Sequence, residues 1–133
     1  MVTVREVMSK EPVTVEPSVT VEEASLEMMT KMVGSALVMR QGRVVGIFTE
    51  RDIMKALSRN ADRGRTMTVR EWMSPDPSTI DANSSVGEAL DRMLEAGFRH
   101  LPVTEEGEVI GIVSMRDLAQ SIAKEPRPQP RTS

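Results

Sequence analysis

Apolar residues recur at helical spacing in two stretches of the chain, and a helix-capping pattern precedes each stretch. Residues 21–32 follow Thr20-x-x-Glu23, and residues 86–97 follow Ser85-x-x-Glu88. Apolar residues three, four and seven positions apart lie on one face of a helix, and a Ser or Thr followed three residues later by Glu satisfies its first N–H groups. Each stretch therefore predicts an amphipathic helix of about three turns.

Paired apolar runs follow each predicted helix. The runs cover residues 36–39 and 44–48 in the first half of the chain, and residues 101–104 and 109–113 in the second half. The connection between the two runs of a pair is short and contains Gly42 or Gly107. A short connection with glycine between two apolar runs predicts a β-hairpin in each half.

One further strand and one further helix complete each half. Residues 13–15 and 78–80 come directly after a proline, which suits the start or edge of a strand, and they predict a short first strand. A last helix is expected to begin near Thr49 or Ser114. Each half is thus β-α-β-β-α, and residues 58–67, which are rich in Arg, Asn, Asp and Gly, are expected to form the connector between the copies.

Sequence motifs repeat along with the pattern. The short capping-box turn of residues 3–9 recurs at residues 68–74, and Gly46 to Asp52 recurs as Gly111 to Asp117. Both pairs are 65 positions apart, because 68 − 3 = 111 − 46 = 65. A unit of this size cannot bury its apolar face alone, so the two copies are expected to pack on one another. Function is therefore expected between the copies.

Composition narrows the function classes. No apolar run reaches the roughly 18 residues that cross a membrane, and the start of the chain does not resemble a secretion signal, so a cytoplasmic protein without membrane contact is expected. The 133 residues include no cysteine, which excludes disulfides and thiolate chemistry. A net charge of −3 and only three aromatic residues, Phe48, Trp72 and Phe98, argue against nucleic acid as a partner.

These linked motifs closely resemble those of the CBS-domain pair, also called the Bateman module. The resemblance rests on the duplicated Thr-Val-x-Glu-x-Met-Ser turn, on Gly-Ile-x-[Ser/Thr]-x-x-Asp in both halves, and on Arg-His-Leu-Pro-Val at residues 99–103. It implies an α/β fold of the α+β kind, in which two tandem β-α-β-β-α repeats form a pseudo-twofold intramolecular pair. Residues 1–62 and 63–124 are expected to form the repeats, and the proline-rich residues 125–133 a disordered tail.

The resemblance also implies a function. Members of the family are regulatory modules that bind adenosyl ligands in two clefts between the repeats. AMP, ADP or ATP is the expected regulatory ligand, with S-adenosylmethionine or NAD as further possibilities. No obligatory cofactor is expected, and the regulated protein is not identified by the sequence.

The chemistry of two short motifs suits such a ligand. Thr49 with Asp52, and Ser114 with Asp117, stand at predicted helix starts, where N–H groups attract phosphate. A carboxylate accepts hydrogen bonds from the two hydroxyl groups of a ribose. The alternative is that both motifs only cap their helices, because Ser/Thr-x-x-Asp is itself a capping pattern.

The resemblance assigns residues to the two clefts. One cleft would combine Ser114, Asp117, Arg99 and Ile112 with Thr14, Val15 and Val33. The other would combine Thr49, Asp52 and Ile47 with Thr79, Ile80 and Phe98. Arg51 and Arg116 either reach the phosphate or remain solvated or salt-bridged.

The two copies differ at one important position. Arg99 in the second copy corresponds to Gly34 in the first, so only one cleft has a cation there for a phosphate. The cleft of Asp117 is therefore predicted to be the stronger phosphate-bearing site, and the cleft of Asp52 is predicted to be weaker or empty.

Other features favour structural roles. His100 is the only histidine and has no Ser or Cys partner marked by the sequence, so the chain is not expected to be an enzyme. The acidic pairs 22–23 and 105–106 fit solvated charge at a helix start and in a turn, so no metal site is expected. The apolar helix faces, together with the resemblance, predict a homodimer. Two alternatives are a structural dimerisation module with empty clefts and a fragment that regulates a larger enzyme or transporter.

Overall fold

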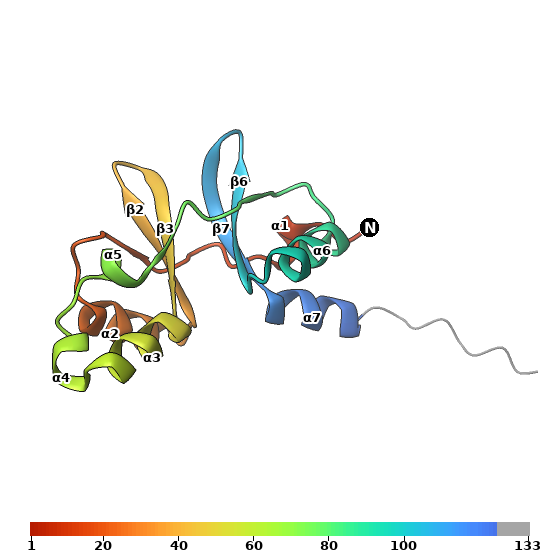
Figure 1. The fold of residues 1–133 in the computed structure, drawn as a ribbon. Coiled ribbons are helices and arrows are strands. Elements are labelled where there is room, and N and C mark those ends of the chain that lie inside the picture. The colour runs from red at the N-terminus through yellow and green to blue at the C-terminus, as the bar shows by residue number, and fades with distance from the viewer. Residues whose placement is uncertain (125–133) are drawn as a thin grey trace, which may run out of the picture.

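Two small sheets, one for each half of the chain, form the framework of the fold in the computed structural model, which describes residues 1–124 (Figure 1). The first sheet has the strand order β1-β2-β3-β4 and the second has the order β5-β6-β7. The strands of the first sheet are β1 Thr14–Val15, β2 Ser35–Arg40, β3 Arg43–Thr49 and β4 Ser74–Pro75. Those of the second sheet are β5 Ile80–Asp81, β6 His100–Glu105 and β7 Glu108–Ser114. The predicted tail lies outside the described residues.

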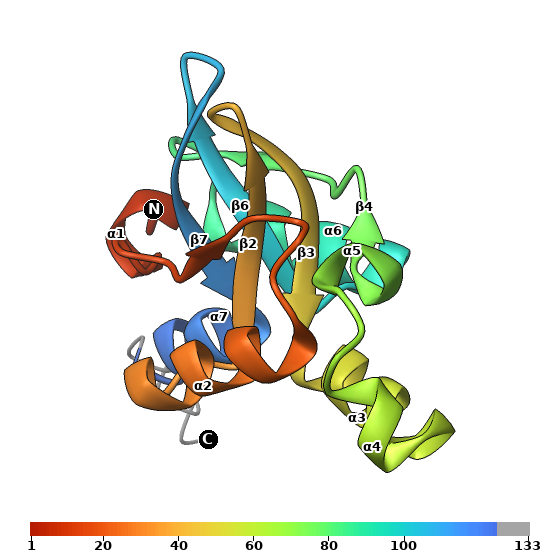
Figure 2. The same cartoon turned by 90° about the vertical axis from the view of Figure 1, so that its left-hand side faces the viewer.

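Helices pack beside both sheets. In the first half they are α1 Val4–Val7, α2 Val21–Lys31, α3 Glu50–Arg59 and α4 Ala61–Gly64. In the second half they are α5 Val69–Trp72, α6 Val86–Ala96 and α7 Met115–Lys124. Helices α2, α3 and α7 lie at the end of the molecule opposite the hairpin turns (Figure 2). Among the described residues, no helix is both long and apolar enough to cross a bilayer.

The capping patterns of the sequence are present as predicted. The Thr20 Oγ1 accepts a 3.1 Å hydrogen bond from the Glu23 N–H at the start of α2. The Ser85 Oγ accepts a 3.0 Å bond from the Glu88 N–H at the start of α6. The boundaries of the two amphipathic helices therefore follow from local chemistry.

Both hairpins are confirmed, and their turns explain the glycines. Gln41 and Gly42 have φ values of 51° and 76°, and Glu106 and Gly107 have φ values of 51° and 82°. Two-residue turns with positive φ at both positions match the twist of antiparallel strands, and glycine adopts this conformation without steric cost. The strands β2–β3 and β6–β7 pair in the same register, displaced by 65 residues.

The connector of residues 58–67 contains a short helix that was not predicted. Helix α4 begins there because the Asn60 side chain accepts hydrogen bonds from the N–H groups of Asp62 and Arg63. The Asn cap stabilises this short helix. The segment is too short to show the apolar periodicity by which a helix is predicted. A Cβ on Gly64 would collide with the carbonyl of Ala56, so the turn of α4 packs directly on α3.

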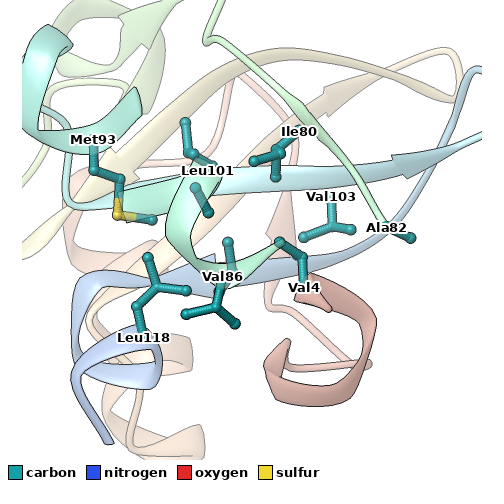
Figure 3. Close-up of a cluster of buried hydrophobic side chains, with 10 residues drawn as sticks. Val4, Ile80, Ala82, Val86, Met93, Leu101, Val103 and Leu118 are labelled. Carbon is teal, nitrogen blue, oxygen red and sulfur yellow. The ribbon is translucent and has the colours of Figure 1, made fainter. Parts of the chain in front are cut away.

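The lead-in segments cross between the halves. Val4 in α1 is fully buried in the core of the second half, beside Val86, Ala82 and Leu118 (Figure 3). Val69 in α5 is fully buried in the core of the first half. The same exchange appears in the backbone, because the N–H of Val4 donates to Ser84 and the N–H of Val69 donates to Val19, both at 2.8 Å. The core of each half is therefore completed by a helical turn from the other half of the chain.

The repeated glycine of the Gly-Ile motif marks these crossings. A Cβ on Gly111 would collide with the carbonyl oxygen of Ser9, and one on Gly46 would collide with the Met73 side chain. Ser9 exchanges two backbone hydrogen bonds with Ile112, of 2.8 and 3.0 Å. Only glycine allows the crossing segment to approach the strand this closely.

The two halves meet along their sheets. Leu37, Ile47 and Ile112 form a separate buried cluster, in which Ile47 and Ile112 occupy equivalent positions of the two repeats. The two hairpins stand beside each other in both views (Figures 1 and 2). The predicted α+β pair of tandem repeats is confirmed.

Candidate functional site

A cavity of about 640 Å³ lies between the two halves. The first half contributes Pro12, Val13, Met32, Val33, Gly34, Ser35 and Glu50, together with Ser9 from the crossing segment. The second half contributes Arg99, His100, Ile112, Ser114, Met115, Arg116, Asp117 and Gln120. This size falls within the range of about 300–1,000 Å³ that small-molecule sites occupy.

The start of α7 carries the polar centre of this cavity. The Ser114 N–H donates a 2.8 Å hydrogen bond to Asp117 Oδ2, and the Asp117 N–H donates a 3.1 Å bond to Ser114 Oγ. The capping interaction therefore uses only Oδ2, and Asp117 Oδ1 accepts no hydrogen bond from residues 1–124. Capping and ligand binding are compatible roles for this carboxylate.

Part of the helix terminus is already occupied. The Met115 N–H donates to the carbonyl of Arg99 at 2.8 Å, and the Asp117 N–H is used by Ser114. The backbone at this terminus offers fewer donors to an anion than an uncapped helix would. The side chains of Arg99 and Arg116 are the positively charged groups of the cavity lining.

The first half forms the apolar wall. Val33 and Ile112 line the cavity, whereas Thr14 and Val15, which the resemblance assigns here, do not. Val15 is 7% exposed and packs in the core of the first half, because β1 pairs in parallel with β2 and turns alternate side chains inward. The residues just before β1, Pro12 and Val13, line the cavity in place of this pair.

Charges of both signs meet in the cavity. Arg99 and Arg116 come from the second half, and Glu50 comes from the first. His100 lies among them, and burial lowers the pKa of its imidazole, while the negative charges of Glu50 and Asp117 act in the opposite direction. Burial therefore favours the neutral form of this imidazole.

The residues around Asp52 are arranged differently. Asp52 is only 7% exposed, and its Oδ2 accepts 2.8 Å and 3.3 Å hydrogen bonds from the Thr49 N–H and hydroxyl. Burial raises the pKa of the Asp52 carboxyl, and the bonds from Thr49 only partly offset this effect. As in Asp117, the cap uses only Oδ2, so the two carboxylates differ in that Asp52 is buried and does not line the cavity.

The other residues assigned to the second cleft divide between core and surface. Ile47 and Ile80 are buried, at 6% and 1% exposure, whereas Arg51, Thr79 and Phe98 are exposed. The Thr79 carbonyl accepts a hydrogen bond from the Arg92 side chain. The 640 Å³ cavity is lined by none of these residues and by neither Thr49 nor Asp52.

The sequence profile of the CBS domain family matches residues 4–59 and 69–124. The chain belongs to the CBS domain family. The two matched segments coincide with the two repeats of the fold, so the chain contains a CBS pair.

Several known proteins resemble this CBS pair in sequence. An uncharacterized 17.7 kDa protein of Acidianus ambivalens is 46% identical over 110 residues, which are 81% of this chain and 65% of that protein. The CBS domain-containing protein YhcV of Bacillus subtilis is 33% identical over 90% of this chain and 84% of its own length. The A-adding tRNA nucleotidyltransferase of Aquifex aeolicus is 27% identical over 92% of this chain, which spans only 14% of that enzyme.

Solved structures of CBS proteins have the same fold. The CBS-domain containing protein ATU1752 from Agrobacterium tumefaciens has a TM-score of 0.84 at 30% identity, covering 90% of this chain and 98% of that one. The CBS domain pair of protein MJ0100, in complex with 5′-methylthioadenosine and S-adenosyl-L-methionine, has a TM-score of 0.84 at 25% identity, covering 92% and 97%.

Most of the residues that line the cavity had not been assigned to a ligand site from the sequence, and Glu50, Pro12 and Val13 are among them. Glu50 lies one position before the arginine of its motif. Its contact with Gly34 forms only because the β2–β3 hairpin brings the two residues together in the fold. Pro12 and Val13 precede the strand residues expected there. A proline just before a short strand is the one signal that marked this segment.

Proposed function

We propose that this CBS pair is a non-catalytic regulatory module that binds an adenosyl ligand in the cavity of Asp117. One observation carries the proposal: the cavity between the repeats brings together a carboxylate with an available oxygen, two arginines and an apolar wall. The adenosyl ligands of the similar MJ0100 pair support it.

Each part of such a ligand has a suitable counterpart. Asp117 Oδ1 is an acceptor for the ribose hydroxyl groups, and hydrogen bonds to a charged group contribute about 1.5–3 kcal/mol each. The base would lie against Val13, Val33 and Ile112, with backbone groups for its polar edge. Arg99 and Arg116 would meet the group attached at the 5′ carbon.

The position of the cavity suggests how binding would regulate. Its walls come from both repeats, so a ligand would bind one relative arrangement of the repeats more tightly than another. A ligand shifts a conformational equilibrium only through such a difference in affinity. The response would pass to a regulated protein, and for AMP, ADP or ATP it would report the energy state of the cell.

A thermal-shift panel of AMP, ADP, ATP, 5′-methylthioadenosine, S-adenosylmethionine and NAD tests the proposal. A ligand present at 100 times its Kd should stabilise the fold by about 2.7 kcal/mol, which corresponds to several degrees. The Asp117→Asn variant is the matched control and should lose the shift. No shift with any of these ligands, and no bound nucleotide in native mass spectrometry, would instead favour a dimerisation module with empty clefts.

A homodimer through the helix faces is part of the same proposal. Met29 on α2 and Leu94 on α6 are 74% and 64% exposed, at equivalent positions of the two repeats. Leu57 on α3 and Ile122 on α7 form a second equivalent, exposed pair. A surface with internal twofold symmetry fits a second copy of itself, so Met29→Glu with Leu94→Glu should convert a dimer to a monomer in light scattering.

The regulated protein is proposed to be larger than this module. The chain spans 65% of the Acidianus relative and 14% of the nucleotidyltransferase, so CBS pairs of this kind occur within longer proteins, including an enzyme. A cytoplasmic location is consistent with an adenine nucleotide as the signal.

A further inference from the structure

Glu50 occupies a defined place in the cavity. It is the first residue of α3, and its N–H donates a 3.1 Å hydrogen bond to the carbonyl of Gly34. Its carboxylate rests directly on Gly34, since a Cβ on that glycine would collide with Glu50 Oε1. The missing side chain of Gly34 therefore provides the space in which the carboxylate lies.

The charge of Glu50 is not neutralised by an ion pair. Residues 1–124 contain three ion pairs, and none of them includes Glu50, Arg99 or Arg116. The charged lining residues other than His100 are two arginines and two carboxylates, Glu50 and Asp117, which gives a formal sum of zero. The cavity therefore has no excess positive charge with which to hold a polyphosphate.

The arrangement belongs to the first repeat alone. At the equivalent positions the second repeat has Arg99 in place of Gly34 and Met115 in place of Glu50. Arg99 and the Glu50 carboxylate both line the cavity, so the opposite charges at these positions act on the same ligand. The cavity is therefore electrically asymmetric at these positions. One side has a glycine and a carboxylate, and the other side has an arginine and a methionine.

Resting on the proposed function, we propose that Glu50 is a specificity-determining residue that selects adenosyl ligands with no more than one phosphate over di- and triphosphates. The physical basis is repulsion of additional phosphates by a carboxylate held in the cavity, which is a way to gain specificity by penalising the wrong ligand. The helix terminus compensates less than an uncapped one would, because the N–H groups of Met115 and Asp117 are already used.

Titration calorimetry with 5′-methylthioadenosine, AMP and magnesium-free ATP tests this selection. The wild-type protein should bind ATP about tenfold or more weakly than AMP. Glu50→Gln should strengthen ATP binding about tenfold and Glu50→Lys should strengthen it further, with little change for the uncharged 5′-methylthioadenosine. Glu27→Gln, an exposed charge on α2 outside the cavity, is the matched control and should change none of the affinities.

The outcomes separate this inference from the proposed function. Wild-type binding of ATP as tight as that of AMP, or an unchanged ATP affinity in Glu50→Gln and Glu50→Lys, would overturn the role of Glu50 and leave the ligand site intact. An equal gain for all three ligands would also overturn it, because charge selection requires a gain that grows with phosphate number. No binding of any ligand to the wild type would overturn the proposed function and this inference together.

Discussion

The two repeats share one backbone plan but distribute volume and charge differently. In the first repeat, Ala36 pairs across the hairpin with Phe48; at the equivalent place in the second, Leu101 pairs with Val113. All four side chains are fully buried. The first pair combines a small residue with a large one, and the second pair combines two residues of intermediate size. Both pairs fill an equivalent space, so core packing constrains the summed volume of a pair more than the size of either residue.

Charge has diverged at the cavity in a similar pairwise way. The first repeat combines Gly34 with Glu50, and the second combines Arg99 with Met115. The residue differences in the core leave the fold unchanged, whereas the residue differences at the cavity give its two sides opposite charge. The two repeats therefore share a scaffold, and the charge on each side of the cavity follows from positions at which they differ.

The largest expected effect comes from exchanging core volume between the repeats. Phe48→Val should destabilise by about 3 kcal/mol by leaving a cavity, and Ala36→Leu by about 1–3 kcal/mol by overpacking. The double variant imitates the pair of the second repeat and should be more stable than the sum of the single effects predicts, by about 0.5–3 kcal/mol. Urea unfolding measures this coupling, and strictly additive effects would contradict the paired arrangement.

The crossing segments offer a test of which core each turn supports. Val4→Ala and Val69→Ala should each cost about 2 kcal/mol, because each removes two buried carbon atoms and leaves a void. In hydrogen exchange under native conditions, Val4→Ala should reduce protection mainly in β6 and β7, and Val69→Ala mainly in β2 and β3. Each variant is the control for the other, and loss of protection within the nearest repeat in sequence would contradict the exchange.

The ends of α2 and α6 differ by a single strained residue. Met32 ends α2 with φ 58°, whereas Gly97 ends α6 with φ 75°. A residue with a Cβ costs about 1 kcal/mol in this left-handed conformation, so Met32→Gly should stabilise the protein by about that amount. Gly97→Ala should destabilise it by a similar amount, and urea unfolding that gave the same sign for both variants would contradict this explanation.

The smallest effect concerns His100, which corresponds to Ser35 in the first repeat. Burial places the pKa of folded His100 below its ordinary value of 6.5, despite Glu50 and Asp117, and Arg99 lowers it further. The unfolded state then binds the proton more readily, so stability is lost as the pH falls through 6.5 toward the lower folded pKa. His100→Ser should remove this part of the acid sensitivity in urea unfolding between about pH 7.5 and 5.5. A difference between the two proteins that does not vary with pH would contradict it.

Much of the fold could be predicted because its signals are local. Capping pairs such as Thr20 with Glu23, and the glycines of the two hairpin turns, specify element ends from neighbouring residues. Helix α4 was missed because a single Asn cap stabilises a turn that has no apolar period. The exchange of Val4 and Val69 between cores was also not predicted, since which core receives a lead-in turn depends on long-range packing.

For the candidate site, the sequence predicted the cavity residues of the second repeat better than those of the first. Ser114, Asp117 and Arg99 line the cavity, and they stand in motifs that mark themselves by repetition. The role of Glu50 could not be inferred because it depends on an empty space over Gly34, which only the folded sheet creates. Burial of Asp52 likewise results from packing that its motif, shared with Asp117, does not reveal.

Titration calorimetry with AMP on the wild type, Asp52→Asn and Asp117→Asn tests the difference between the two clefts most directly. The account predicts one bound nucleotide per chain, a loss of affinity of about tenfold or more in Asp117→Asn, and little change in Asp52→Asn. Both substitutions keep a side-chain oxygen that can accept the capping hydrogen bond, so the folds should remain comparable. Two equivalent sites in the wild type, or a larger loss in Asp52→Asn, would contradict the assignment of the ligand to the Asp117 cavity.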